Sequence, residues 1–233
     1  MPVLLHGLIP AGSALCPDAP EHGMIACGQF AALVSPAPPG LDQLPPEAIA
    51  ELALNHNAIL VAYCTRCAVL PMRFGAAFSS AEIARQHVLA DAVGNLRALT
   101  AVADLREYTV RLTVTGDPRV AERTVTTGRD FLSKGRDLRD RRKTLTEGRT
   151  HLARRLLEGL HPLSHQLEAA GAARPERLID LAILLQPDRL DHLTALASEI
   201  SLAAAPLGLQ LHVAGPWPAY SFKLQQSEMC DGA

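Results

Sequence analysis

The sequence contains one pair of cysteines whose spacing could support chemistry, Cys64 and Cys67 in a Cys-Thr-Arg-Cys run. Such a CxxC pair can hold half of a zinc site or form a redox-active disulfide. The chain has no second CxxC and no ordered set of Cys or His partners. The pair also lies at the end of a predicted helix, whereas a helix start would stabilise a thiolate. We therefore expect buried structural thiols and keep a thiol- or metal-dependent enzyme as the alternative.

Other motifs give no complete catalytic or metal-binding set. His161 and His165 are four residues apart, which is a metal-ligand spacing on a helix, but Pro162 disfavours an uninterrupted helix and no HExxH glutamate is present. The sequence has no phosphate-binding loop, no GxGxxG and no GxSxG nucleophile elbow. We predict no catalytic residues, no cofactor and no metal, and hence a protein that is not an enzyme.

Positive charge is concentrated in one segment. Residues 117–158 hold 12 Lys/Arg against 7 Asp/Glu, and the densest run is Arg136–Lys143. Asp137 and Asp140 dilute the positive field there, and no aromatic residue that would stack on a base lies within the run. We expect a solvated helix face. An acidic protein partner is the second interpretation and a weak nucleic-acid-binding module the third, so no nucleic acid partner is predicted.

The composition is that of a globular cytoplasmic protein. Hydrophobic residues make up 48% of the 233 positions and charged residues 20%, so the chain can bury a core. Its length favours two modest domains over one large one. Five cysteines without regular spacing indicate a reducing compartment. No apolar run approaches the ~20 residues of a membrane span, so we expect no membrane partner.

Residues 1–102 are predicted to form an N-terminal α/β sandwich domain. Short apolar runs predict strands at 3–9, 24–27 and 30–35, with a tight turn at Gly28-Gln29 between the last two. Helical spacing begins after Pro45-Pro46-Glu47 and continues to Tyr63. A capping box at 79–82 then predicts one further helix that reaches Leu99 and covers a face of the sheet.

Residues 103–222 are predicted to form the second domain of an α+β fold. The period changes to two near Leu105, which predicts a strand, and further strands are expected at 179–185 and 207–213. Residues 118–168 read as one long helix or a helical hairpin, and Asp188 is expected to cap another helix. The order β-α-β-α-β is consistent with a ferredoxin-like domain. Residues 223–233 are expected to be a disordered tail.

Three segments carry a resemblance to a known family. They are His56-Asn57 followed by Val69-Leu-Pro-Met-Arg-Phe-Gly75, the strand Ala31–Ser35 before a Pro-rich loop, and Gly215-Pro-Trp-Pro-Ala-Tyr-Ser-Phe222 after the last strand. The last segment is the most specific, because a run of eight with Trp, Tyr, Phe and two Pro seldom arises by chance. In these segments the chain resembles the gas vesicle protein F/L family (GvpF/GvpL).

The resemblance implies a non-enzymatic role in building gas vesicles, the buoyancy compartments of the cytoplasm. Members are taken to be assembly factors and minor structural components that bind the small hydrophobic shell protein, and other gas vesicle proteins, in a chaperone- or nucleation-like manner. It also implies an N-terminal α/β domain and a modified ferredoxin-like C-terminal domain. The candidate partner-binding residues come from its motifs, although packing inside the protein remains the alternative for them: Arg73, Phe74, Trp217, Tyr220 and Phe222.

Overall fold

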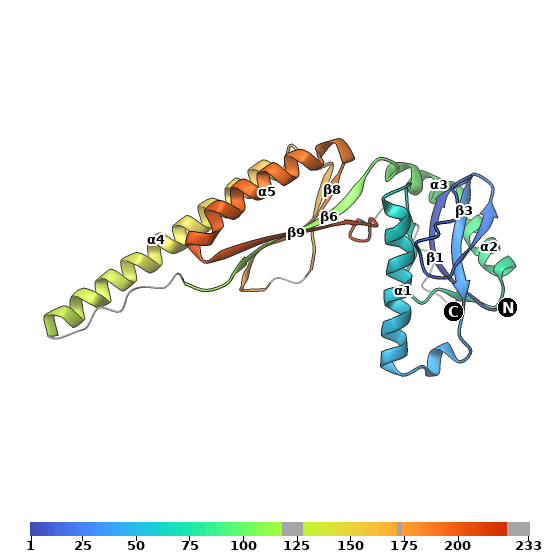
Figure 1. The fold of residues 1–233 in the computed structure, drawn as a ribbon, viewed down its shortest axis with the longest axis horizontal. Helices are drawn as coiled ribbons and strands as arrows, with labels where there is room; N and C mark the ends of the chain where they lie inside the picture. The colour runs from blue at the N-terminus through green and yellow to red at the C-terminus, as the bar shows by residue number, and fades with distance from the viewer. Residues whose placement is uncertain (118–127, 172–173, 223–233) are drawn as a thin grey trace. The chain divides into compact units, whose positions relative to one another are not determined.

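The computed structural model describes residues 1–117, 128–171 and 174–222 (Figure 1). The chain divides into two compact units, one formed by Met1–Glu107 together with the segment that begins at Gly215, and one formed by Tyr108–Ala214. Each unit combines helices with one antiparallel sheet, as the predicted α+β class requires. The sequence placed the terminal motif in the second domain, whereas the contacts group it with the first unit. The predicted tail at 223–233 lies outside the described residues.

The first unit is built on a five-stranded sheet of order β2-β3-β1-β4, with β5 also paired to β1. The predicted hairpin is confirmed, because β2 and β3 pair antiparallel from Cys27↔Phe30 and Gly28 between them has φ 79°. The elements of this unit in chain order are β1 Val3–Pro10, β2 Gly23–Cys27, β3 Phe30–Pro36, α1 Pro46–Cys64, β4 Leu70–Pro71, β5 Ala77–Phe78, α2 Ala81–Ala90 and α3 Ala92–Ala101.

Helices cover both faces of this sheet (Figure 1). On one face, α1 buries Ile59, Leu60 and Tyr63 against Ile9 and Leu33. On the other face, α2 and α3 pack on the opposite side chains of the same strands, because successive residues of a strand point to opposite sides. That second core cluster includes Leu5, Phe30, Ala32, Val34, Val88 and Leu99. The sheet is therefore the middle layer of a three-layer unit.

The predicted single helix after residue 79 is wrong in two details. The helical conformation is interrupted at Asp91 (φ −125°, ψ 52°), so α2 and α3 are separate helices. The Asp91 side chain caps α3 by accepting a hydrogen bond from the Gly94 N–H at 3.1 Å. The cap of α2 is Ser80, whose hydroxyl oxygen accepts from the Ile83 N–H. The capping box was thus predicted one residue too early. Asp91 is favoured as a cap because its short side chain competes with helical backbone bonds.

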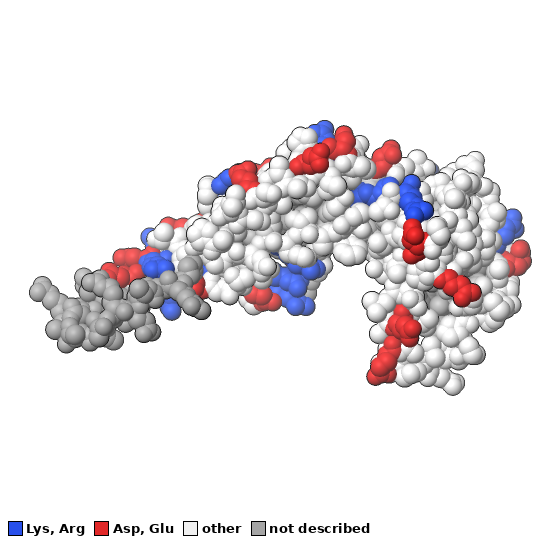
Figure 2. Space-filling view, viewed as in Figure 1, with Lys and Arg blue, Asp and Glu red and all other residues white. Residues whose placement is uncertain are grey.

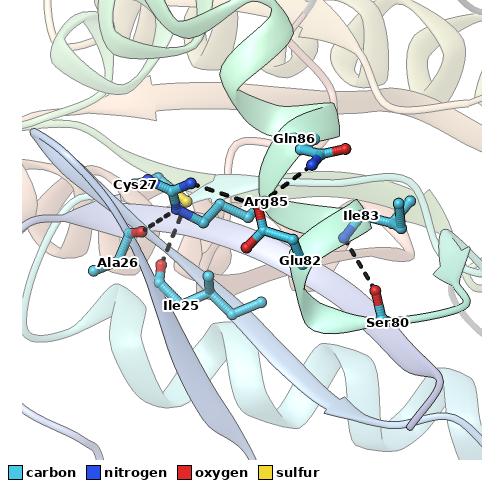
Figure 3. Close-up of polar contacts among 8 residues, drawn as sticks. All are labelled: Ile25, Ala26, Cys27, Ser80, Glu82, Ile83, Arg85 and Gln86. Atoms are coloured by element: carbon cyan, nitrogen blue, oxygen red, sulfur yellow. Dashed lines mark hydrogen bonds and ion pairs between the residues drawn. The ribbon is translucent and has the colours of Figure 1, made fainter.

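Helix α2 also protects the open edge of the sheet. Strand β2 is an edge strand, and the carbonyl of Ala26 accepts a hydrogen bond from Arg85 Nε at 3.2 Å (Figure 3). Glu82 lies 3.7 Å from the same guanidinium, and this ion pair helps to orient it. Unpaired carbonyls on an edge strand invite association with other chains. The arginine satisfies one of them from within the unit.

The second unit carries a four-stranded sheet of order β7-β8-β6-β9. Its helices α4 and α5 lie side by side on one face (Figure 1), and their leucines share one core with Tyr108, Val110, Leu112, Ile179 and Ile183. The elements in chain order are β6 Arg106–Val114, α4 Gly128–Leu160, β7 Gln166–Ala169, β8 Arg177–Leu185, α5 Leu190–Ala204 and β9 Leu209–Trp217.

Three predictions for this unit need correction or completion. The segment predicted as helical to residue 168 leaves the helical conformation after Leu160, and β7 follows at Gln166–Ala169. The element order is therefore β-α-β-β-α-β. Within 128–160 the helix is continuous, and Gly148 lies close to Leu207, since a Cβ there would be 3.0 Å from Leu207 Cδ2. Asp188 sits inside a short 3-10 turn, Pro187–Arg189, and does not cap α5.

An ion-pair group joins the two central strands of this sheet. Asp180 on β8 accepts from Arg111 Nε on β6 at 2.8 Å and also pairs with Arg177. Burial alone would raise the pKa of Asp180, but the hydrogen bonds from Arg111 and Arg177 outweigh it and lower the pKa. The carboxylate therefore stays ionised and fixes the register of the two strands. Among the described residues, no helix is both long and apolar enough to cross a lipid bilayer.

We predict that Gly7→Ala destabilises the first unit. A Cβ at Gly7 would lie 2.6 Å from Leu60 Cδ2 and 2.9 Å from the Leu70 carbonyl oxygen, and the backbone oxygen cannot move without disturbing β4. Overpacking of this kind costs about 1–3 kcal/mol. Gly23→Ala is the matched control, because its nearest neighbour would be Val34 Cγ2 at 4.0 Å. Urea unfolding measures both, and equal midpoints for the two variants would contradict the prediction.

Candidate partner-binding site

Two consecutive residues of α1 bring the family-like motifs together. The ring of Phe74 meets the ring of His56 edge to face, with centroids 5.6 Å apart and an interplanar angle of 78°. One residue further along, Asn57 Oδ1 accepts a long hydrogen bond of 3.4 Å from the Tyr220 hydroxyl. Both aromatic side chains are partly exposed, Phe74 by 38% and Tyr220 by 45%. Segments far apart in the sequence thus present two rings beside one helix.

A tight turn positions Phe74. Strand β4 pairs with β1, and the Met72 N–H donates to the His6 carbonyl at 2.9 Å, so the chain is anchored up to Met72. The chain then turns, with Gly75 at φ 86° and the Ala76 N–H donating to the Arg73 carbonyl at 3.3 Å. Glycine is favoured at Gly75 because other residues rarely adopt this left-handed conformation. The turn leaves Arg73 and Phe74 exposed at its tip.

A pair of buried histidines, His6 and His56, lies beneath the Phe74 ring of this turn. His6 Nδ1 lies 3.0 Å from His56 Nδ1, and His6 Nε2 lies 2.8 Å from the Ser35 hydroxyl. Burial, helped by His56 and His22, lowers the pKa of His6 to about 4, and burial also lowers the pKa of His56. Both rings are therefore neutral at pH 7 and share one hydrogen between their Nδ1 atoms. His56 Nε2 is buried and has no hydrogen-bond partner among the described residues.

A buried carboxylate holds the terminal motif that carries Tyr220. Glu107 is only 4% exposed and accepts from the Ser221 N–H at 2.9 Å and from the Ser221 hydroxyl at 2.8 Å. Burial raises the pKa of Glu107, and its hydrogen bonds from Ser221 and the Tyr220 backbone oppose that rise. On either side of Tyr220, Ala219 and Phe222 are buried at 7% and 5% exposure. Tyr220 is thus an exposed ring on an anchored segment.

The five predicted partner-binding residues divide into three groups. Arg73, Phe74 and Tyr220 are exposed, and Phe74 contacts His56 of α1 whereas Tyr220 contacts Asn57, the next residue of that helix. Trp217 is half-buried at the end of β9. Phe222 belongs to the core. The two interpretations of the motifs, packing inside the protein and contact with a partner, therefore apply to different residues of the same motif.

Comparison with known proteins assigns the chain to a family. The family model described as gas vesicle synthesis protein GvpL/GvpF matches residues 19–223. The chain belongs to the GvpL/GvpF family. Its role is therefore related to gas vesicles.

Solved structures agree with this assignment at the level of the fold. The chain resembles the crystal structure of gas vesicle protein GvpF from Anabaena sp. PCC7120 with a TM-score of 0.68 at 13% identity, over 94% of each chain. It also resembles GvpF from Microcystis aeruginosa with a TM-score of 0.64 at 12% identity, over 95% of this chain and 98% of that one. Among curated proteins, none matches the sequence.

Burial keeps both thiols of the CxxC pair of this GvpL/GvpF protein protonated. Cys64 is 2% exposed, and burial raises its pKa to about 12. Burial also raises the pKa of Cys67, and both thiols are free. A protonated thiol is neither a nucleophile nor a ready metal ligand. His161 and His165 are exposed, and the described residues contain no group of three or more His, Cys, Asp or Glu placed to hold a metal ion.

Sequence reasoning missed the groups that support the site. His6 had a usable signal, because it is an ionisable residue inside an otherwise apolar strand and therefore needs a buried partner. Its partner His56 lies 50 residues away, so the pairing depends on the fold. Glu107 had no comparable signal, since it is the second residue of β6 and falls in the alternating positions of that strand that polar residues occupy. The role of Glu107 depends on the fold, which brings Ser221 of the terminal motif next to it.

We predict that the histidine pair makes stability pH-dependent. The pKa of His6 is about 4 in the folded state against an ordinary 6.5, so the unfolded chain binds more protons between these values. The free energy of unfolding contributed by this group should fall by up to about 3 kcal/mol as pH drops from about 6.5 to 4. Urea unfolding across this range should show a smaller loss in His6→Asn. His212→Asn, which changes an exposed histidine, serves as the control, and equal slopes in all three proteins would refute the assignment.

We predict that Ser221→Ala loosens the terminal motif. The substitution removes the hydroxyl that donates to Glu107 Oε1, one of the hydrogen bonds that this buried carboxylate accepts from the terminal motif. The expected loss is about 1–3 kcal/mol in the free energy of unfolding. Hydrogen exchange should report faster exchange of the Ser221 amide than in the wild type. Ser201→Ala changes an exposed serine of α5 and should have no effect. If the Ser221 amide exchanges as slowly in Ser221→Ala as in Ser201→Ala, the hydroxyl bond to Glu107 does not hold the terminal motif in place.

Proposed function

We propose that this protein is a non-enzymatic gas vesicle assembly factor and minor vesicle component that binds the small hydrophobic shell protein in the cytoplasm. The observation that carries the proposal is that two exposed aromatic rings, Phe74 and Tyr220, contact successive residues of α1 in a chain that belongs to the GvpL/GvpF family. A shell subunit with a strongly apolar face aggregates unless another protein holds or delivers it. An apolar contact surface is what that task requires.

The chemistry of the two rings suits such a partner. Aromatic side chains bury a large area and lose little side-chain freedom, which is why they dominate the energetic centres of interfaces. Arg73 lies next to Phe74 and is exposed, without an ion-pair partner among the described residues. It can provide a polar rim to the apolar contact. Phe222 and the buried parts of the motif hold the surface in place.

Preorganisation supports the same conclusion. Phe74 rests on a buried histidine pair, and Tyr220 is flanked by Ser221, which is fixed to Glu107. Neither ring sits on a long free loop, so little conformational freedom remains to be lost on binding. Rings that served only to fill space in the core would be buried, as Phe222 is.

We also propose that the second unit is a modified ferredoxin-like domain and that the two units are the two domains of the fold. The order β-α-β-β-α-β, with both helices on one face of a sheet ordered β7-β8-β6-β9, supports this classification. The thiol-enzyme alternative loses support, because the raised pKa values of Cys64 and Cys67 keep both thiols protonated at neutral pH.

Binding to the purified shell protein tests the proposal. Phe74→Ala/Tyr220→Ala should weaken binding by about tenfold or more, because each truncation removes an interface aromatic worth about 1–2 kcal/mol. The control is Val93→Ala/Leu202→Ala, which removes two other exposed apolar side chains, 73% and 81% exposed. Both double variants should keep the wild-type thermal midpoint. If the two bind the shell protein equally well, Phe74 and Tyr220 are not the contact.

A further inference from the structure

Strand β9 is an open edge of the sheet in the second unit. Among the described strands it pairs only with β6, so its other side has no strand beside it. It runs for nine residues, contains no Lys, Arg, Asp or Glu, and has no proline before Pro216. In the view of Figure 2 the surface along the course of β9 is white, without the red or blue of charged groups. A long edge strand without charge is a template for pairing with another strand.

The other sheet edges in the described part of the chain are short or protected. Strand β7, at the far edge of the same sheet, has four residues and carries the exposed Glu168. In the first unit, β2 has five residues, and Arg85 donates to its Ala26 carbonyl. Strands β4 and β5 have two residues each. Short length and charged side chains are usual protections of an edge, and β9 has neither.

The backbone of β9 shows which residues face the open edge. The Thr115 N–H donates to the Gly208 carbonyl at 2.9 Å, so this carbonyl points toward the chain that continues from β6. In an antiparallel ladder, the backbone groups of successive residues point alternately to one neighbouring strand and to the other side. The N–H and C=O groups of Leu209, Leu211 and Val213 therefore point away from β6, to the side on which no described strand lies.

The side chains of the same stretch divide between the two faces of the sheet. Leu209, Leu211 and Val213 belong to the core beneath α4 and α5 or pack against it. Gln210 and His212 alternate with them and are exposed on the other face. A strand added at this edge continues both faces only if it has the same alternation of apolar and polar residues. The β9 strand of a second copy meets this requirement.

We propose that β9 pairs antiparallel with β9 of a second copy of this chain, centred on Leu211. Leu209 of each copy then lies opposite Val213 of the other, and Leu211 lies opposite Leu211, so the outward backbone groups bond to each other. The apolar side chains stay on the helix-covered face, and Gln210 lies opposite His212 on the exposed face. The two four-stranded sheets become one continuous sheet.

The observations favour a second copy over a strand from a different protein. Pairing of β9 with itself satisfies two open edges in one contact, and it brings no like charges together because β9 has no charged residue. Backbone hydrogen bonds supply the affinity in strand addition, and the alternating side chains set its register. This association is separate from the proposed binding of the shell protein, which uses Phe74 and Tyr220 of the first unit.

Sedimentation velocity of the full chain, up to about 1 mM protein, tests the proposal by detecting even a weak dimer. Wild-type protein should dimerise as concentration rises and form nothing larger, because one two-fold contact uses both β9 edges. Gln210→Lys/His212→Lys should weaken dimerisation by about tenfold or more, since lysines then face each other across the strand pair. The matched control is Gln186→Lys/His192→Lys, which makes the same changes at two exposed positions of the second unit and should stay within about threefold of wild type.

Mixing oppositely charged variants separates the effect of charge from a loss of folding. Gln210→Glu/His212→Glu should dimerise as poorly as the lysine variant, whereas an equimolar mixture of the two should form a heterodimer, because each lysine then faces a glutamate. A mixture that stays monomeric would overturn the proposal, as would a wild-type chain that is monomeric at every concentration. Dimerisation that the lysine substitutions leave unchanged would place the interface elsewhere and overturn it too.

Disulfide trapping tests the register. Opposite residues of a non-hydrogen-bonded antiparallel pair have Cα atoms about 4.5 Å apart, which is within the reach of a disulfide. Mixed with oxidised glutathione, Gln210→Cys and His212→Cys should form a disulfide-linked heterodimer, while neither variant alone should form more linked dimer than wild type. Linked dimer in His212→Cys alone would centre the pairing on His212 and contradict the proposed register.

Discussion

The close approach of α1 to β1 at Gly7 is the constraint on which the first unit depends. With no side chain at Gly7, Leu60 of α1 and the Leu70 carbonyl of β4 can both reach the same point on β1. Strand β4 can then pair with β1, and the turn after it brings Phe74 to α1. His56 reaches His6 across the same narrow gap, and Phe74 rests against His56. The absence of a Cβ at Gly7 thus permits the close packing of α1, β1 and β4 that places the exposed ring of Phe74.

Polar groups buried in this unit specify position at some cost in stability. A neutral histidine pair gains one hydrogen bond where two apolar side chains would gain packing, and His56 Nε2 is left without a partner among the described residues. Glu107 is likewise a buried acid that water would solvate better. In return, each group accepts only one arrangement of its partners. Apolar contacts tolerate sliding, whereas the Glu107–Ser221 bonds fix the terminal motif to a single register.

Sequence patterns predicted the elements better than their contacts. Period-two and helical spacing located the main strands, α1 and α5, because each depends on local alternation of apolar residues. They missed β7, which has only four residues with one half-buried leucine. The break at Asp91 was also missed, because helical periodicity continues across it while the backbone does not. The family-like motifs contained the exposed Phe74 and Tyr220, but nothing local distinguished them from the buried Phe222. Exposure within a motif depends on the return of distant chain segments.

Helix length relative to sheet length explains where new surface arises. A helix gains about 1.5 Å per residue and a strand about 3.3 Å, so a 33-residue helix is longer than the nine-residue strands that it packs against. The apolar row of α4 keeps its period beyond the sheet, and charged residues occupy the places beside it. Leu138 and Leu145 therefore continue the seven-residue spacing of the buried Leu152 along the same side of the helix.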